Sequence, residues 1–259
     1  MMPSSPVSYL LWISLMLLLA SAVFRAGRVA ALGWALFAFF WTGQIGHYLD
    51  ISDYFNVALF LAAGILSLYM AWIIWNRGFS SNACRWASYA AAASGLIYFP
   101  FAEMEPLKAA LIGFTTTLTA SSLQLFSVPV VLESWNMMSL NGSRVEIILA
   151  CTAIESIALF AGVILSVRAP LGRRLAALAA STLSIYVLNI MRNGFVLMAY
   201  GWSWFGKDSF EIAHNFIAKI GSTLALLAIS YVVFMLLPEL LSIIDELAAE
   251  IKPKRGDAA

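Results

Sequence analysis

Charged side chains are scarce in this sequence. Only 11% of its 259 residues are Asp, Glu, Lys or Arg, whereas an average soluble domain carries about 25%. So few charges cannot cover a globule of this size with solvated side chains, which excludes a soluble globular enzyme and a disordered chain. The net charge of +1 and the lack of a long basic block exclude a nucleic-acid partner.

Cysteine and histidine are scarce as well. The two cysteines, Cys84 and Cys151, lie far apart, with no CxxC motif and no Cys/His spacing that suits a metal. This pattern excludes a disulfide scaffold and a thiolate-rich zinc site. We expect neither a metal nor an organic cofactor, because the few possible ligands lack a metal-binding spacing. Cys84, beside Arg85, is expected to be structural.

Apolar residues make up most of what is there. They account for 62% of the chain, and the mean hydropathy is +0.86. A helix needs about 20 mostly apolar residues to cross the hydrocarbon core of a membrane. The expected fold is therefore all-α, a polytopic transmembrane helical bundle in one integral-membrane domain, 1–259. Its seven candidate spans are Val7–Phe24, Val29–Gly46, Phe55–Trp75, Cys84–Phe101, Glu146–Val167, Leu175–Tyr200 and Ile220–Leu237.

An eighth apolar stretch, Leu107–Phe126, is interrupted by hydroxyl residues between Thr115 and Ser122. This pattern favours a helix that lies in the membrane interface or packs against the bundle. The stretch could still span if its hydroxyls bond back to the backbone, which would give eight spans.

The positions of the basic residues favour one of these two topologies, because cytoplasmic loops carry an excess of positive charge. With seven spans every basic group lies inside, the N-terminus is outside and the C-terminus is inside. With eight spans the two early arginine loops break the rule. The basic groups are Arg25 with Arg28, Arg77 with Arg85, Arg168 with Arg173 and Arg174, and Lys252 with Lys254 and Arg255 of the tail.

Several residues with nucleophilic or ionisable side chains gather at the predicted outer face. Cys151 is expected about one turn into the fifth span, where a lone cysteine is usually a core residue. Glu155 follows four residues later, on the same helical face. An ionisable group inside a span is costly and marks function or a buried partner.

The sixth span and the loop after it supply basic partners. Arg192 lies between Asn189 and Asn193, and polar side chains at this depth need hydrogen-bond partners inside the bundle. His214 with Asn215, and then Lys219, come just before the last span. The other histidine, His47, is more simply the polar end of a span.

Cysteine, arginine and histidine together can carry out acyl transfer. The thiolate is the reactive form of cysteine, and a neighbouring cation or histidine favours it. Arginine can hold the oxyanion of a tetrahedral intermediate. Histidine can take the thiol proton and return it to the leaving amine.

At this point the sequence resembles the exosortase/archaeosortase family. The order of a cysteine, an arginine and a third basic residue is the specific part of the match, which covers about the last 150 residues. The motifs that carry it are Ala150–Ser156 with Phe160-Ala161-Gly162, Asn189–Asn193, Ile212–Asn215, and Val128-Pro129-Val130 with the polar, strand-like stretch up to Val145.

The resemblance implies a sortase-like cysteine transpeptidase at the outer face of the cell membrane. Cys151 would be the nucleophile, Arg192 would stabilise the oxyanion or thiolate, and His214 would be the third residue, with Lys219 as its alternative. Glu155, Asn189, Asn193 and Asn215 would support the site or bind substrate. Within 1–259, it implies N-terminal spans in 1–105, a catalytic core in 106–237 and a cytoplasmic tail in 238–259.

The resemblance also implies the partners. Substrates would be secreted surface (S-layer) proteins with a C-terminal signal: a Pro-Gly-Phe tripeptide, a transmembrane helix and a basic cluster. A membrane lipid would be the acceptor. The sequence leaves the lipid, the substrates and the oligomeric state open.

Three other functions fit the same residues. A solute transporter or ligand-binding membrane protein would use Glu155, Arg192 and His214 as a polar site, with Cys151 as filler. A membrane protease would share the nucleophile and differ only in using water as the acceptor. A structural scaffold would pair Glu155 with Arg192 for packing alone.

Overall fold

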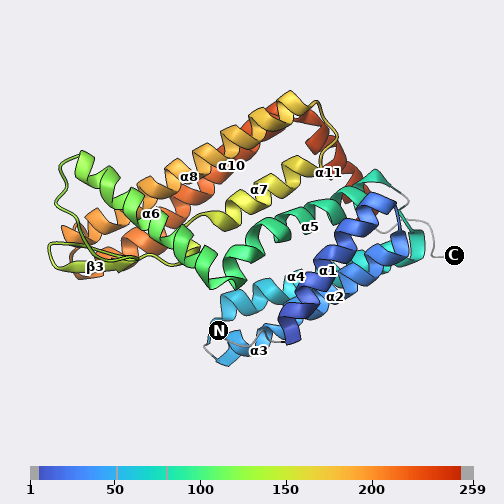
Figure 1. Cartoon of the computed structure of the whole chain (residues 1–259), viewed down its shortest axis with the longest axis horizontal. Helices are drawn as coiled ribbons and strands as arrows, with labels where there is room; N and C mark the ends of the chain where they lie inside the picture. The colour runs from blue at the N-terminus through green and yellow to red at the C-terminus, as the bar shows by residue number, and fades with distance from the viewer. Residues whose placement is uncertain (1–5, 51, 80, 252–259) are drawn as a thin grey trace. The chain divides into compact units, whose positions relative to one another are not determined.

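The structure, a computed structural model, describes residues 6–50, 52–79 and 81–251. These residues form helices with one small sheet, in two compact units (Figure 1). The first unit contains the chain up to Leu96, the segment Gly162–Arg168 and the chain from Pro238 onward. The second unit contains Ile97–Ala161 and Ala169–Leu237. Each unit is described by itself below.

The first unit is built around helices that pack through apolar faces. Helix α1 contacts α2, and α2 contacts α4. On α1, the side chains of Leu11, Leu15 and Leu18 are completely buried. The N-terminus of α4 is capped by Asp53, whose carboxylate accepts a hydrogen bond from the backbone N–H of Asn56 at 3.1 Å. The helices are α1 (Pro6–Phe24), α2 (Gly27–Gly43), α3 (Ile45–Asp50), α4 (Tyr54–Arg77), most of α5 (Asn82–Glu103) and α11 (Pro238–Ile251).

The second unit combines helices with a three-stranded antiparallel sheet of order β1-β2-β3. Its two long helices, α8 and α10, run side by side (Figure 1). In chain order the elements are α6 (Glu105–Leu125), β1 (Val131–Ser134), β2 (Met137–Leu140), β3 (Ser143–Glu146), the 3₁₀ turn η1 (Leu149–Cys151), the first part of α7 (Ile154–Ser166), α8 (Leu171–Gly201), η2 (Gly206–Asp208), α9 (Ser209–Glu211), the π-helix η3 (Ile212–Ile217) and α10 (Ala218–Leu236).

The sheet is fixed to the end of α8. Its β2–β3 connection is a two-residue turn, Asn141-Gly142, in which both residues have positive φ angles of 51° and 84°, as a type I′ hairpin requires. The Asn141 side chain donates a hydrogen bond to the carbonyl of Gly201 at 3.2 Å. Apolar residues of the sheet join a buried cluster with α6 and α8, which includes Leu123, Met138, Leu140, Val145 and Leu197.

The predicted fold class, a multi-pass helical membrane bundle, is confirmed, and most predicted spans match helices within a few residues. Among the described residues, four segments are long and apolar enough to cross a membrane: Gly27–Asp50, Asn56–Arg77, Leu171–Gly201 and Gly206–Leu236. The predicted helix Leu107–Phe126 exists as α6 but is not one of these four. The choice of seven crossings over eight stays a prediction.

The predicted start of the fifth span is wrong. Residue Glu146 ends strand β3, and the helix begins only at Ile154. Ala153 explains the break, because its φ of +61° is left-handed and cannot continue a right-handed helix. The resulting helix, α7, has 13 residues and is about 20 Å long at 1.5 Å per residue.

Part of the predicted tail is an ordered helix, α11, which belongs to the first unit. Glu250 on α11 forms an ion pair with Arg77 at 3.4 Å, and Glu246 accepts a hydrogen bond from the backbone of Asn82 at 3.2 Å. The basic residues Lys252, Lys254 and Arg255 lie outside the described residues.

Candidate active site

Cys151 lies at the end of a short 3₁₀ turn rather than inside a helix. Its side chain is half-buried and packs against the apolar cluster of the second unit. Leu149, Met198 and Tyr200 pack against the same cluster. The turn is held by the Thr152 hydroxyl, which donates to the carbonyl of Leu149 at 2.7 Å. The cysteine is therefore presented on a fixed turn between the sheet and α7.

Two asparagines hold the backbone of this turn. The side-chain amides of Asn189 and Asn193, one turn apart on α8, both donate to the carbonyl oxygen of Cys151, at 2.7 and 2.9 Å. A 3₁₀ turn that ends at Cys151 leaves this carbonyl without a helical partner, so the two amides satisfy it. The structure thus brings together Cys151, Asn189 and Asn193, three of the residues singled out in the sequence.

The predicted relation between Cys151 and Glu155 is wrong. The break at Ala153 separates them, so they do not share a helical face. Glu155 lies in the first turn of α7 and accepts a hydrogen bond from the hydroxyl of Tyr98 at 3.3 Å. Among the described residues, no ion pair joins Glu155 to Arg192, although both line the same cavity.

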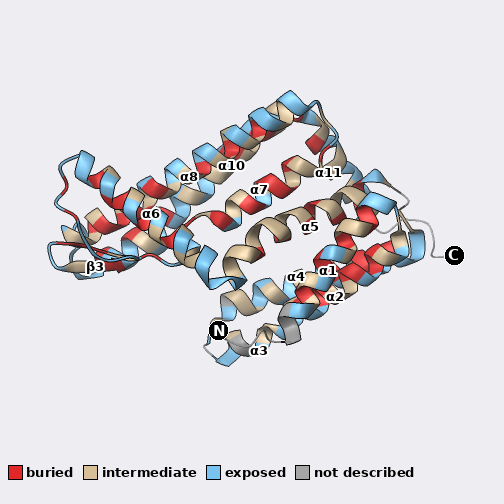
Figure 2. Ribbon diagram, viewed as in Figure 1, coloured by how far each residue is buried: buried red, intermediate tan, exposed pale blue. Residues whose placement is uncertain are grey.

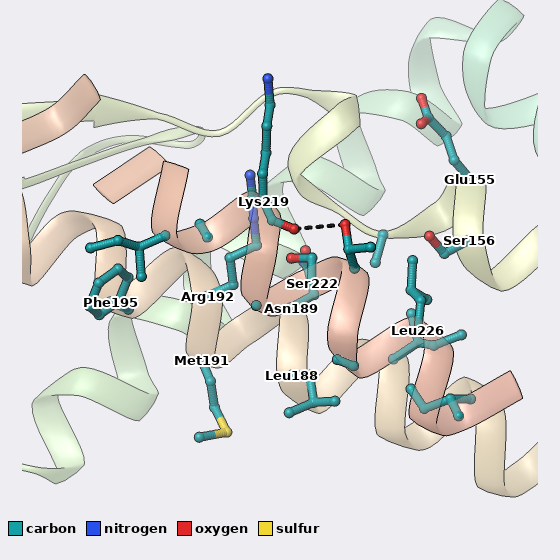
Figure 3. Close-up of a pocket in the computed structure, with 18 of the residues that line it drawn as sticks. Glu155, Ser156, Leu188, Asn189, Met191, Arg192, Phe195, Lys219, Ser222 and Leu226 are labelled. Carbon is teal, nitrogen blue, oxygen red and sulfur yellow. Dashed lines mark hydrogen bonds between the residues drawn. The ribbon is translucent and has the colours of Figure 1, made fainter. Parts of the chain in front are cut away.

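That cavity has a volume of about 640 Å³ and lies within the second unit, between the start of α7, α8 and α10 (Figure 3). Arg192 and Lys219 extend in the same direction in this view, from α8 and α10. Ala150 and Ala153 also line the cavity, whereas Cys151 between them is not one of the described lining residues. The cavity therefore borders the cysteine turn.

His214 lies in the π-helix η3, close to the start of α10. Its ring stacks on Phe210 with 5.3 Å between centroids, and its Nδ1 is 3.1 Å from the side-chain oxygen of Asn215. Single π-helical turns occur frequently at functional sites. His214 is not among the described residues that line the cavity, and the side chain of His47 lies outside what the structure describes.

Several residues of this region are not predicted by the sequence analysis. Tyr98 binds Glu155, and Ser156, Ser222 and Thr223 line the cavity. The hydroxyl residues of α10 carried a usable signal, because they follow Lys219 at positions i+3 and i+4 and so share its helical face. Tyr98 is 57 residues from its partner and carries no such signal.

The arrangement suits acyl transfer by a thiol. A cysteine on a fixed turn borders a cavity that contains a guanidinium, an ammonium and a carboxylate. Cations of this kind stabilise the negative charge that develops on a carbonyl oxygen during nucleophilic attack. In the part of the chain that the structure describes, no three His, Cys, Asp or Glu residues form a group that could hold a metal ion.

Comparison with known proteins agrees with this chemistry. The profile of the transmembrane exosortase family matches residues 5–235. The chain is 30% identical to archaeosortase A of Haloferax volcanii, with 85% of this chain and 83% of that protein covered. It is 28% identical to archaeosortase A of Natronomonas pharaonis, with 86% and 79% covered. No solved structure matches the chain. The protein thus belongs to the transmembrane exosortase family, which confirms the resemblance seen in its motifs.

Proposed function

We propose that this protein is a sortase-like cysteine transpeptidase of the membrane and that Cys151 is its nucleophile. The family match and the two archaeosortase relatives agree with the predicted function, a membrane transpeptidase that processes C-terminal sorting signals. The strongest support for Cys151 as the nucleophile is the way its turn is held. Asn189 and Asn193, on either side of Arg192 in the sequence, both donate hydrogen bonds to the carbonyl of Cys151. Helix α8 therefore carries both the groups that hold the cysteine turn and the arginine.

In the first step, the sulfur of Cys151 attacks the carbonyl carbon of a peptide bond in the sorting signal. The thiol proton passes to the third residue, and the C–S bond forms as the carbonyl oxygen becomes an oxyanion. Collapse of this intermediate breaks the C–N bond, and the third residue returns the proton to the leaving amine. The products are a thioester and the released C-terminal helix.

In the second step, a hydroxyl or amine of a membrane lipid attacks the thioester carbon. A bond forms between the lipid oxygen or nitrogen and the acyl carbon, and the C–S bond breaks. The proton that the nucleophile loses passes through the third residue to the cysteine sulfur. The surface protein is then attached to the lipid, and the enzyme is restored.

Arg192 is the proposed stabiliser of the oxyanion or thiolate, because arginine stays charged and presents several donors in a planar fork. His214 is the proposed third residue. Asn215 supports it, since the amide oxygen accepts only: with this partner the His214 Nδ1–H donates, and Nε2 keeps a lone pair for the thiol proton. Lys219 is the alternative third residue, because it shares the cavity with Arg192.

The proposed substrates are surface (S-layer) proteins that carry the Pro-Gly-Phe signal, a transmembrane helix and a basic cluster at the C-terminus. A signal attached to a transmembrane helix is presented close to the lipid headgroups, so the nucleophile must face the same side. This requirement agrees with the predicted topology, in which the N-terminus and the site lie outside.

The test is mass spectrometry of a candidate substrate co-expressed with the wild-type protein, with Cys151→Ala or with His214→Ala. We expect the wild type to remove the C-terminal helix and add lipid mass, Cys151→Ala to do neither, and His214→Ala to be severely impaired. Near-normal processing by His214→Ala would move the third role to Lys219. Cleavage by Cys151→Ala would overturn the proposal.

Two competing functions give different results in the same samples. A protease would release a shortened substrate that carries no lipid. A transporter, the function favoured by a cavity that contains Glu155 and Arg192 but not Cys151, would leave the substrate intact, and its transport would survive Cys151→Ser.

A further inference from the structure

We propose that the cavity between α7, α8 and α10 binds the acceptor lipid. The lipid is a glycerophospholipid: Lys219 holds its phosphate, and one apolar chain lies along the face of α10. This inference rests on the proposed transpeptidase function and assigns the second substrate of that reaction to a place in the structure.

The cavity has the polarity of such a lipid. The cationic side chains of Arg192 and Lys219 lie toward one end, and Leu188 and Met191 lie toward the other (Figure 3). Within the described part of the chain, neither Arg192 nor Lys219 has an ion-pair partner. In the described structure Glu155, the carboxylate of the lining, pairs with neither cation. A phosphate group would supply a counter-charge, and charge-assisted hydrogen bonds to phosphate are among the stronger ones in proteins.

Small residues on α10 keep the apolar part of the cavity open. Ala218, Gly221, Ser222 and Ala225 recur at helical spacing along the lining face, which continues to Ile229. A Cβ atom added at Gly221 would meet no other atom within 4 Å. The face from Ala218 to Ile229 is about 17 Å long at 1.5 Å per residue, enough for a long stretch of one lipid chain.

The charge of the cavity distinguishes a lipid from the substrate's transmembrane helix as the occupant. Arg192 and Lys219 line it, whereas a transmembrane helix is mostly apolar along its length. A lipid with an anionic headgroup supplies both a charge that matches the two cations and an apolar chain for the rest of the cavity.

The position also suits the second chemical step. The lining includes Ala150 and Ala153, on either side of Cys151 in the sequence. A headgroup whose phosphate is bound by Lys219 therefore has its hydroxyl or amine close to the cysteine turn. From there it can attack the thioester carbon, release the cysteine sulfur and give up its proton.

The first experiment measures how the thioester divides between lipid and water. The full-length enzyme is reconstituted with a sorting-signal substrate in vesicles of phosphatidylethanolamine or phosphatidylglycerol. Phosphatidylcholine vesicles serve as the control, because choline has neither a hydroxyl nor an amine that can attack. Mass spectrometry gives the ratio of lipid-linked to hydrolysed product and the total cleavage.

We expect Lys219→Gln and Gly221→Leu to lower this ratio about 10-fold or more, the effect of losing one charge-assisted contact or of blocking the chain. Total cleavage by Gly221→Leu should stay within about two-fold of the wild type, and Lys219→Arg should restore most of the transfer that Lys219→Gln loses. The matched controls Lys207→Gln and Gly172→Leu, which do not line the cavity, should leave the ratio unchanged.

A second experiment tests binding without chemistry. The Cys151→Ala protein is irradiated in vesicles that contain phosphatidylethanolamine with a diazirine in its acyl chain. We expect crosslinks at Leu226 and Ile229, fewer of them when Gly221→Leu is added, and no change when Gly172→Leu is added.

Three results would overturn the lipid site. An equal loss of cleavage and transfer in Gly221→Leu would make the cavity part of the peptide site. A ratio that neither variant changes would exclude the cavity as the acceptor site. If the wild type transfers to neither lipid, an unchanged crosslink pattern in Gly221→Leu would also exclude the cavity as the acceptor site. Failure of the proposed function is a separate result, cleavage by Cys151→Ala.

Discussion

Two pairs of helices in this protein use glycine in opposite ways. On α2 of the first unit, a Cβ atom at Gly33 would lie 3.0 Å from the Leu18 side chain and 3.1 Å from its backbone nitrogen. On α10 of the second unit, a Cβ atom at Gly221 would meet nothing within 4 Å. The first glycine brings two helices into contact, whereas the second leaves space beside a cavity.

The residues around each glycine follow the same division. Near Gly33 the buried side chains include those of Leu18, Trp34 and Phe37, and Figure 2 colours parts of α1 and α2 as buried. Near Gly221 the lining includes Arg192, Lys219 and hydroxyl groups. We infer that the first pair of helices serves stability and the second serves binding and catalysis, because open polar cavities sacrifice packing that a scaffold would use.

The largest expected effect on activity is at Arg192. Arg192→Ala should reduce substrate cleavage about 10²- to 10³-fold, the usual cost of removing one donor to an oxyanion. Arg192→Lys should recover only part of this, since it keeps the charge and loses the fork. Cleavage rates and thermal unfolding of the purified variants measure both properties. A large loss of stability in Arg192→Ala would contradict the division between the two helix pairs.

Gly33→Leu should have the opposite profile. Its new side chain collides with Leu18, and overpacking of a tight contact typically costs about 1–3 kcal/mol of unfolding free energy. Thermal unfolding should therefore occur at lower temperature, while the cleavage rate of the folded fraction stays near that of the wild type. Gly221→Leu is the matched comparison and should unfold like the wild type. Equal destabilisation by both substitutions would remove the contrast.

Asn193→Ala tests the hold on the cysteine turn. Asn193 is buried and donates one of the two hydrogen bonds to the Cys151 carbonyl, so its loss should slow cleavage about 10-fold, the effect of one buried hydrogen bond. Asn189→Ala should act in the same way. The double variant should lose more than the sum of the single free-energy changes, since only then is the carbonyl without a partner. Strict additivity would argue against a shared role.

The smallest effect is expected on the sheet. The Ser139 hydroxyl and then the Arg144 guanidinium hold the pKa of the Glu133 carboxyl below its ordinary value. A lowered folded pKa stabilises the protein above the unfolded pKa, and this contribution disappears as the pH falls through the folded value. Because the Arg144–Glu133 pair is solvent-exposed, Arg144→Ala should hardly change thermal unfolding at pH 7. Any difference in unfolding temperature between Arg144→Ala and the wild type should vanish in acid. A large difference at neutral pH would assign the pair to the structural core.

Much of the fold follows from hydrophobic patterning. The long apolar runs of α4, α8 and α10 are helical within a few residues of the predicted ends, because a run of this length has few other ways to satisfy its backbone in a membrane. The strand-like stretch before Val145 is a sheet, with the turn at Asn141-Gly142 that such a sequence favours. The expectation that polar side chains beside Arg192 need partners inside the bundle agrees with the hydrogen bonds of Asn189 and Asn193.

The cysteine turn could not be predicted in the same way. Residues Ile147–Ala153 are mostly small or apolar and resemble the start of a helix, and nothing in the sequence shows that Ala153 is left-handed. Alanine pays a steric cost in that conformation, so it is held there by contacts distant in sequence. The amides of α8 that bind Cys151 come from 38 and 42 residues away. The site depends on these distant contacts, which local patterning does not encode.

The length of α7 has a consequence for the fate of the thioester. A helix of 13 residues covers about 20 Å, whereas the hydrocarbon core is about 30 Å thick. If Ser166 lies at the inner boundary, the cysteine turn before α7 is recessed from the outer one. A recessed thioester lies nearer to the proposed lipid cavity than to bulk water. The acyl-enzyme would then favour transfer over hydrolysis simply through where it forms, with no need for a lid to exclude solvent.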